Sequence, residues 1–141
     1  MAANDFKTIA RMVEHWRSSG VKLRPPATEA GIVAFEQRFG VRLPLDMRHY
    51  FLLTDGMDYG AWDNNNFSFW ELERLRPLAE QLPEPIHASY RNFPDAKCFF
   101  CFADWLIDCT VFRVYFSRPV ARQVISSCFP QYSAQVFPMK T

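Results

Sequence analysis

Three of the four cysteines in this sequence lie between Lys97 and Cys109, and two of them form a C-x-x-C pair. Such a pair can supply two thiolates of a tetrahedral zinc site where the chain turns tightly, or a redox dithiol at a helix N-terminus. The stretch KCFFCFA instead predicts a strand, in which alternating side chains send Cys98 and Cys101 to opposite faces. The remaining cysteines, Cys109 and Cys128, are isolated, and no second C-x-x-C is present. We therefore interpret all four cysteines as buried structural thiols and expect no metal site.

Histidines and glycine-rich loops, the other usual carriers of chemistry, form no catalytic motif in this sequence. A zinc deaminase needs H-x-E, but the residues two places after the three histidines are Arg17, Phe51 and Ser89. The sequence also lacks G-x-G-x-x-G, G-x-x-x-x-G-K-S/T and G-x-S-x-G, which mark dinucleotide, nucleotide and acyl-transfer sites. We therefore predict that the protein is not an enzyme and has no cofactor. A Cys–His pair assembled from distant parts of the chain is the open alternative.

The length and composition fit one globular domain in the cytoplasm. The 141 residues are 49% hydrophobic and 22% charged, and can bury a core without disulfide bonds. A formal net charge of +1 gives no electrostatic footprint for nucleic acid. No run of about 18 apolar residues predicts a membrane span, and the start MAANDFKTIARM lacks the pattern of a secretory signal. We expect a cytoplasmic protein with reduced cysteines that binds neither nucleic acid nor membranes.

The acidic residues concentrate in one part of the chain, although the total charge is nearly balanced. From His49 to Glu73 there are five acidic side chains and no lysine or arginine. These are Asp55, Asp58, Asp63, Glu71 and Glu73. A solvated loop and strand edge is the simpler interpretation of such a run. The alternative is an acidic surface that attracts a basic partner.

Helical periodicity and capping residues predict three helices in the first part of the chain. Apolar residues recur at three- and four-residue steps between Asp5 and Gly20, with Asp5 as the cap and Gly20 as the stop. Thr28 and Gly40 bound a second helix in the same way. Pro44 then suits the first turn of a third helix, which we expect to end near Gly56.

Strand formers replace helix formers in the second part of the chain. FSFW, residues 67–70, alternates large and small side chains and predicts a strand, as does KCFFCFA, residues 97–103. DWLIDCTVFRVYFS, residues 104–117, has apolar residues on both faces, which predicts an interior strand covered on two sides. Helices first and a sheet afterwards indicate an α+β protein, with N-terminal helices packed on a mainly antiparallel central sheet.

Several parts of the sequence resemble a known family. TEAGIVAFEQRFGVRLPLDMRHYFLLTDG, residues 28–56, is similar to the SUKH superfamily, which includes bacterial immunity proteins and a yeast cell-wall assembly regulator. The matching positions are Phe35-Glu36, Phe39-Gly40, Leu43-Pro44, Phe51-Leu52 and Gly56. FSFWELERL and CFADWLIDCTVFRVYFS resemble later elements of the family, in the family's order, and the second of them is similar to a strand pair of the family. The resemblance implies a single SUKH-like domain over residues 1–141. Residues 119–141 depart from it, because they lack the helical period of the family's last helix, so they form either a divergent strand pair or an incomplete domain end.

The resemblance implies a protein that acts by binding and not by catalysis. Immunity proteins of this superfamily hold a cognate toxin domain and block its active site, and nuclease toxins are basic because they grip phosphates. We therefore predict a toxin-binding surface made by Asp55, Asp58 and Asp63 with Tyr59 and Trp62, since acids select a basic partner and aromatic side chains anchor interfaces. Packing of Trp62 beneath its own loop is the alternative at that position. A cytoplasmic regulatory scaffold for an endogenous protein is the second functional hypothesis, and an unrecognised hydrolase is the third.

Overall fold

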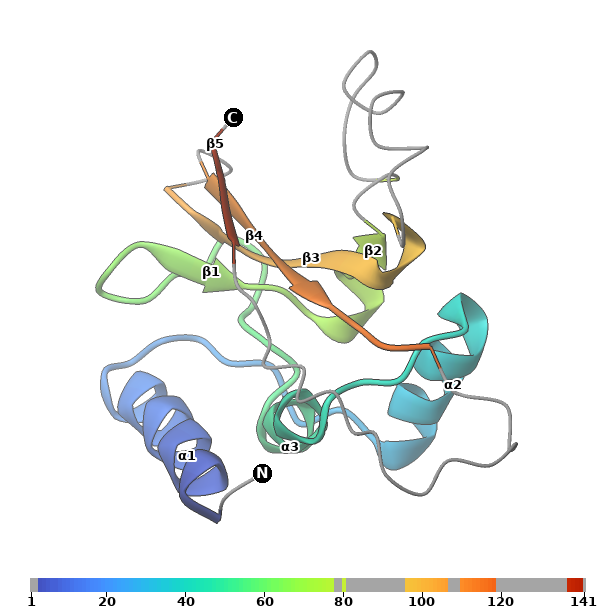
Figure 1. Cartoon of the computed structure of the whole chain (residues 1–141). Coiled ribbons are helices and arrows are strands. Elements are labelled where there is room, and N and C mark those ends of the chain that lie inside the picture. The colour runs from blue at the N-terminus through green and yellow to red at the C-terminus, as the bar shows by residue number, and fades with distance from the viewer. Residues whose placement is uncertain (1–2, 78–79, 81–95, 107–109, 119–136, 141) are drawn as a thin grey trace.

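Helices on one side of an antiparallel sheet make up the fold, which we describe from a computed structural model. The structure describes residues 3–77, 80, 96–106, 110–118 and 137–140. In this part of the chain, helices α1 (Ala3–Ser18), α2 (Glu29–Phe39) and α3 (Leu45–Leu53) come first and lie on the same side of the sheet (Figure 1). The predicted α+β class, with N-terminal helices followed by an antiparallel sheet, is confirmed.

Local sequence signals set the ends of α1 and α2. Thr28 Oγ1 accepts a hydrogen bond from the Gly31 N–H at 3.0 Å, which satisfies one of the donors left open at a helix start. Gly20 and Gly40 follow the two helices in the left-handed conformation, at φ +79° and +61°, which glycine adopts without strain. These predicted boundaries are confirmed. α1 begins at Ala3, however, so Asp5 lies inside the helix and not at the N-cap position that the sequence predicts.

The third helix is shorter than the sequence predicts. Pro44 stands just before its first turn as expected, but α3 ends at Leu53 and not near Gly56. The reason is Thr54, which is extended and fully buried. Its hydroxyl lies 3.0 Å from the carbonyl oxygens of both Arg24 and Gly56, so this side chain holds the backbone that leaves the helix.

β3 (Phe99–Trp105) is the central strand of the sheet. Along one edge it pairs with β4 (Thr110–Tyr115). Along the other edge it pairs with both β1 (Phe67–Phe69) and β2 (Arg76–Pro77), which follow one another along its length. β5 (Phe137–Lys140) pairs with β4 and completes the order β1-β3-β4-β5. Each of these strand pairs is antiparallel, which agrees with the predicted sheet type.

Two strands occupy residues 104–117, where the sequence predicts one. β3 ends at Trp105, Leu106 has a left-handed φ of +51°, and β4 begins at Thr110. The prediction of one continuous strand, made from the apolar pattern, is therefore wrong, whereas the strand pair that the family resemblance implies agrees with β3 and β4. Apolar residues on both faces arise here because two neighbouring strands of a hairpin follow one another in the sequence. Residues 107–109, between the two strands, lie outside the described part of the chain.

Within the C-terminal segment, residues 119–141, the structure describes residues 137–140, which form β5. This strand pairs with β4, so these four residues belong to the sheet. The other residues of the segment lie outside the described part.

β3 begins two residues later than predicted, because Ala96–Cys98 form a short 3-10 turn. The strand also carries a register shift between Cys101 and Ala103. Phe100 and Cys101 are both buried, as are Ala103 and Asp104, so side chains along this strand do not simply alternate between core and solvent.

Both cysteines of the C-x-x-C pair are buried in the core. Cys98 is 0% and Cys101 is 1% exposed, and both thiols are free. Burial raises the pKa of the Cys101 thiol to about 11, although Arg113 opposes the rise, so this thiol is protonated and unreactive at neutral pH. The interpretation as buried thiols is confirmed for these two cysteines. Cys109 and Cys128 lie outside the described residues.

Aromatic rings join the helices to the sheet. Phe35 of α2 lies 5.5 Å from Phe100 of β3 between ring centres, and Phe116 lies 5.0 Å from the same ring. Trp16 of α1 lies 4.7 Å from Phe69 of β1. Such pairs add about 0.5–1.5 kcal/mol each beyond the area that they bury. The packing therefore fixes the β1 edge of the sheet against α1.

Candidate functional site

The chain between α3 and β1 forms a loop, residues 57–66, whose base is held by a close backbone contact. Gly56 has a φ of +76°, and a Cβ atom there would lie 2.6 Å from the carbonyl oxygen of Trp70. The next residue, Met57, donates its N–H to the Phe69 carbonyl oxygen at 2.9 Å. Because glycine alone permits this approach, the start of the loop is fixed against the end of β1.

The far end of the loop is held by β3 and by an internal turn. Trp105 Nε1 donates a hydrogen bond to the carbonyl oxygen of Asn65 at 2.9 Å. Asp63 organises the turn, since its Oδ1 accepts hydrogen bonds from the N–H groups of Asn65 and Phe67 at 2.8 and 3.0 Å. The loop conformation is therefore determined by the two strands that it contacts.

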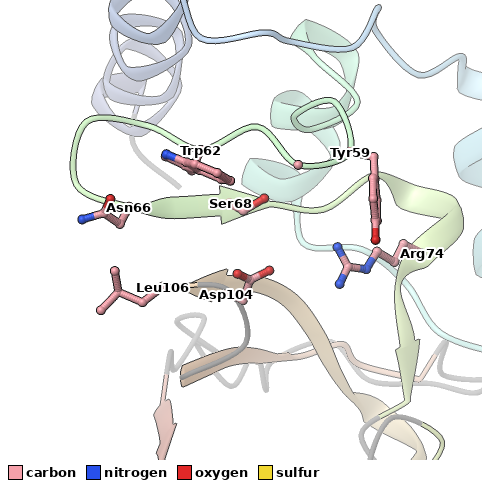
Figure 2. A pocket seen from close by; sticks show the side chains of 8 residues that line it. Tyr59, Trp62, Asn66, Ser68, Arg74, Asp104 and Leu106 are labelled. Carbon is pink, nitrogen blue, oxygen red and sulfur yellow. The ribbon is translucent and has the colours of Figure 1, made fainter.

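A pocket of about 340 Å³ opens between this loop and the sheet (Figure 2). Its lining consists of Tyr59, Gly60, Trp62, Asn66, Ser68, Arg74, Asp104 and Leu106. Ser68 of β1 and Asp104 of β3 lie directly opposite each other in the strand register, and Figure 2 shows them beneath Trp62. Trp62 is 50% exposed and Tyr59 is 97% exposed. The pocket thus combines a polar floor with aromatic walls.

Asp104 is the buried acid of this pocket, with 5% of its surface exposed. Its carboxylate accepts a hydrogen bond from Trp70 Nε1. The Trp70 ring in turn lies under Arg74, whose guanidinium carbon is 3.8 Å from the ring centre, a cation–π contact. A buried carboxylate needs hydrogen-bond donors to be tolerated, and the indole N–H is one of them. The pocket floor is therefore connected to the core through Trp70.

The structure brings together two of the five residues that the sequence predicts for partner binding. Tyr59 and Trp62 line the pocket, and the half-exposed Trp62 is not covered by its own loop. Asp55, Asp58 and Asp63 are not among the lining residues. The carboxylates of Asp55 and Asp63 accept hydrogen bonds from backbone N–H groups, so both hold the chain in place. Asp58 is exposed to solvent.

Two arginines outside the stretch between His49 and Glu73 offset part of its negative charge. Arg24 Nε lies 2.8 Å from Glu71 Oε2 and forms an ion pair with it. Arg74 lines the pocket itself. Of the five acidic residues in the stretch, Asp58 and Glu73 are exposed. The surface is therefore acidic at separate points and not as one continuous patch.

The carboxyl group of Asp55 makes the stability of the protein depend on pH. Burial raises the pKa of its carboxyl group and Glu71 and Glu73 add to the rise, while the Leu72 N–H and Arg24 oppose it. The folded state therefore holds this proton more tightly than the unfolded chain does. As a result, the contribution of Asp55 to the free energy of unfolding falls as the pH rises from the unfolded pKa of about 3.9 through the folded pKa.

We expect Asp55→Asn to remove this part of the pH dependence, because asparagine keeps an oxygen acceptor for the Leu72 N–H and carries no charge. Urea unfolding of both proteins between about pH 4 and pH 7 measures the effect. The stability of the variant relative to the original protein should increase with pH. Two parallel pH profiles would contradict the prediction.

Asp104, Ser68 and Arg74 are pocket residues that the sequence patterns do not single out. A weak signal exists, since Asp104 and Ser68 are polar residues inside the short apolar runs FADW and FSFW. Ser68 and Asp104 lie opposite each other because of the register between β1 and β3, and the alternation of side chains along each strand does not specify that register. Arg74 reaches the pocket from a short 3-10 turn, Leu72–Arg74, which has no sequence signature of its own.

Histidines and clustered acids offer no second site in the part of the chain that the structure describes. No group of three His, Cys, Asp or Glu side chains is arranged there to hold a metal ion. His15 is exposed, and the His49 ring packs 4.7 Å from Phe6 on α1. His87 lies outside the described residues. Within the same residues, none of the helices is both long enough and apolar enough to span a bilayer.

The fold and the pocket define a small α+β protein with an aromatic-walled pocket at one end of its sheet. The family model of the SMI1 / KNR4 family (SUKH-1) matches residues 26–130, and the chain belongs to this family. The SUKH resemblance of the sequence is thereby confirmed. All residues that line the pocket fall within the matched range. A comparison with curated proteins gives no match.

Membership of this family is consistent with an immunity protein or a related regulator. The family is known for non-catalytic proteins, and its role in immunity suggests that the chain acts through protein–protein interaction. The pocket agrees with such a role in its chemistry, because exposed aromatic rings beside a concave surface suit contact with another protein.

Proposed function

We propose that this protein is an immunity protein, which binds a cognate bacterial toxin domain and neutralises it by covering its active site. The observation that carries the proposal is a cluster of exposed apolar side chains at the pocket. Its members that line the pocket are Tyr59, Trp62 and Leu106, with exposed fractions of 97, 50 and 40%. Trp105, which precedes Leu106 in the chain, is 37% exposed and does not line the pocket. Among the described residues, the other large hydrophobic side chains with comparable exposure are Val33 and Leu45, on α2 and α3. The exposed apolar surface is therefore concentrated at one end of the sheet.

The chemistry of this cluster suits a protein interface. Tyrosine and tryptophan are enriched among the residues that carry most of the binding energy, and they immobilise few rotatable bonds when they bind. The loop that carries Tyr59 and Trp62 is already ordered by β1 and β3, so a partner does not have to order it. A pre-organised aromatic surface of this kind supports tight binding.

We further propose that the toxin is a nuclease. Nucleases present basic surfaces, because they contact the phosphates of their substrates. The exposed carboxylates of Asp58 and Glu73 belong to the segment that builds the pocket, and they would attract such a surface. The acids would thus contribute to the rate of association, and the aromatic side chains to the lifetime of the complex.

Reversing the charge at Asp58 is expected to slow association with the toxin about five- to tenfold at low salt. Asp58→Lys leaves the aromatic cluster intact, so the dissociation rate should change little. Surface plasmon resonance at a series of salt concentrations measures both rates, and the difference in association rate should shrink as salt screens the charges.

Glu29→Lys is the control for net charge, because it makes the same charge change on α2, away from the loop that precedes β1 (Figure 1). It also removes the ion pair between Glu29 and Arg48, so a thermal melt must first show that this variant is folded. It should slow association much less than Asp58→Lys. Equal effects of the two substitutions would mean that net charge, and not an acidic site beside the pocket, governs association.

Affinity capture of the tagged protein from its native cells, followed by mass spectrometry, tests the proposed function. We expect the C-terminal domain of a large secreted protein to co-purify in stoichiometric amount. Expression of that domain alone should stop growth, and co-expression of this protein should restore it. Recovery of an endogenous housekeeping partner with no toxicity would favour the regulatory scaffold instead, and turnover of a substrate without a partner would favour the hydrolase.

A further inference from the structure

We infer that the pocket between the loop 57–66 and the sheet receives an uncharged aromatic side chain of the partner protein, a tyrosine. This inference rests on the proposed function, and it names the residue that the partner inserts. The pocket volume of about 340 Å³ lies at the lower end of the range of small-molecule sites, about 300–1,000 Å³. One large side chain is therefore a suitable occupant.

The two charged side chains that line the pocket compensate each other. Asp104 accepts a hydrogen bond from Trp70 Nε1, and the guanidinium group of Arg74 stacks on the same indole, 3.8 Å from the ring centre. Figure 2 shows Arg74 pointing toward the side of the pocket where Asp104 lies. A guest of either charge would meet one like and one opposite charge, and it would lose hydration as it entered. The pocket therefore favours an uncharged guest.

The walls of the pocket favour an aromatic guest. Trp62 and Tyr59 present their rings on the loop side, and Leu106 presents apolar surface just after β3 (Figure 2). All three side chains are exposed, so a flat apolar guest would remove much of this surface from water. An aromatic guest gains in addition from offset or edge-to-face contact with the two rings.

Tyrosine matches the floor of the pocket as well as its walls. Ser68 lines the floor opposite Asp104, and its hydroxyl group offers a hydrogen-bond donor and acceptor without charge. The tyrosine hydroxyl can bond to such a group while the ring contacts Trp62. The residues that dominate binding energies are enriched in tyrosine, tryptophan and arginine, and they pair with one another across interfaces. Of these three, arginine is charged and the tryptophan N–H can only donate, so tyrosine fits best.

Charge acts on the partner outside the pocket. Asp58 is exposed on the same loop and is not a lining residue, so it can attract a basic surface without contacting the inserted side chain. Tyr59, which is 97% exposed at the edge of the pocket, can contact the surface around that side chain. A protein is therefore favoured as the partner over a small free ligand.

Titration of the full chain with short peptides tests the inference without any toxin. The probe is acetyl-Gly-Tyr-Gly-amide. Two matched controls keep the ring and replace its hydroxyl group by an aminomethyl or a carboxyl group, which are charged at neutral pH. A third control has leucine in place of tyrosine. NMR signals of the Trp62 indole N–H and of the Leu106 methyl groups report binding, because both residues line the pocket and the ring current of an aromatic guest shifts them.

We expect saturable shifts of both signals at millimolar concentrations of the tyrosine peptide. Each of the three controls should bind at least fivefold more weakly. Absence of shifts with the tyrosine peptide would overturn the inference. Binding of any control as tightly as the tyrosine peptide would overturn it as well.

Substitutions locate the site and test the charge compensation. Trp62→Ala should weaken binding of the tyrosine peptide at least fivefold, and the half-exposed position means that the fold should tolerate the change. Arg74→Met removes the guanidinium group and keeps the Asp104 carboxylate, so the aminomethyl peptide should gain at least fivefold relative to the tyrosine peptide. Leu45→Ala, at an exposed apolar side chain on α3, should leave binding unchanged.

Two results with these variants would overturn the inference. One is an unchanged order of the peptides with folded Arg74→Met protein, which would mean that the two charges do not compensate each other. The other is binding that survives Trp62→Ala at full strength, which would place the peptide elsewhere. The second result decides the matter even if Arg74→Met does not fold.

The outcome is separate from that of the proposed function. Growth rescue by this protein with no peptide binding would sustain the immunity function and remove the tyrosine site. Peptide binding with no toxic partner would sustain the site and remove the immunity function.

Discussion

Gly56→Ala should lower the free energy of unfolding by about 3 kcal/mol or more. Two effects combine at this position. The φ of +76° is strained for any residue with a side chain, which costs about 1–2 kcal/mol. In addition, the new Cβ would lie 2.6 Å from the Trp70 carbonyl oxygen and 2.8 Å from that of Phe69. These are backbone atoms, so the loop or the end of β1 must shift to make room.

Gly20→Ala separates the two effects, because Gly20 has nearly the same φ, +79°, with no atom within 4 Å of the added Cβ. We expect this control to lose about 1–2 kcal/mol, the conformational part alone. Urea denaturation of the three proteins at one pH gives the comparison. Equal losses for the two variants would show that the sheet yields easily and that the close approach has no role in holding the loop.

The same contact is expected to affect the pocket. A shift between Gly56 and the end of β1 displaces the loop that carries Tyr59 and Trp62 relative to the floor at Asp104. Gly56→Ala protein that still folds should therefore bind the partner more weakly than Gly20→Ala protein. In physical terms, the glycine links the stability of the sheet edge to the geometry of the binding surface.

The helical part of the fold could be predicted well because its signals are local. The N-cap at Thr28 and the left-handed glycines Gly20 and Gly40 act within a few residues of the chain, and the structure places the helix ends at them. The end of α3 is different. Thr54 terminates that helix through contacts with the carbonyl of Arg24, thirty residues away in sequence, and no local pattern contains this information.

The sheet could be predicted in class and not in detail. Strand formers correctly indicated strands near residues 67–70 and 97–103, but the end of β3 at Trp105 was hidden because strand-forming residues continue on both sides of it. Turns with left-handed residues are usually marked by glycine or asparagine, and here Leu106 adopts that conformation. Local composition therefore gave no warning that the chain reverses.

The pocket shows most clearly what lies beyond the sequence. Tyr59 and Trp62 could be chosen from a short loop because they are large aromatic residues among polar neighbours. The predicted acids of the same surface were chosen by charge alone, although the Asp55 and Asp63 carboxylates accept hydrogen bonds from backbone N–H groups. Asp104 reaches the site through the pairing of β1 with β3, a contact between residues far apart in the chain. Charge can be read from a sequence, but whether a carboxylate faces a partner or a backbone N–H cannot.

Replacing both aromatic walls, Tyr59→Ala with Trp62→Ala, should reduce the affinity for the cognate toxin domain by a factor of about 1,000, or about 4 kcal/mol, if each residue contributes as interface hot spots do. Both side chains are held by a loop that is anchored at each end, so their removal deletes contact area without disordering the backbone. Isothermal titration calorimetry with the purified toxin domain measures the loss. Most of it should appear as faster dissociation.

Leu45→Ala is the matched control for this double variant, because Leu45 is a 60% exposed apolar residue on α3, outside the pocket. Its affinity for the toxin should equal that of the original protein, and the melting temperatures of all three proteins should agree within a few degrees. Unchanged affinity of the double variant, together with intact growth rescue, would move the interface away from this end of the sheet. Reduced affinity in the Leu45→Ala control would indicate instead that the toxin contacts the helical side of the molecule, where the exposed apolar residues are isolated and not clustered. The two results therefore distinguish an interface built on the pocket from one built on the helices.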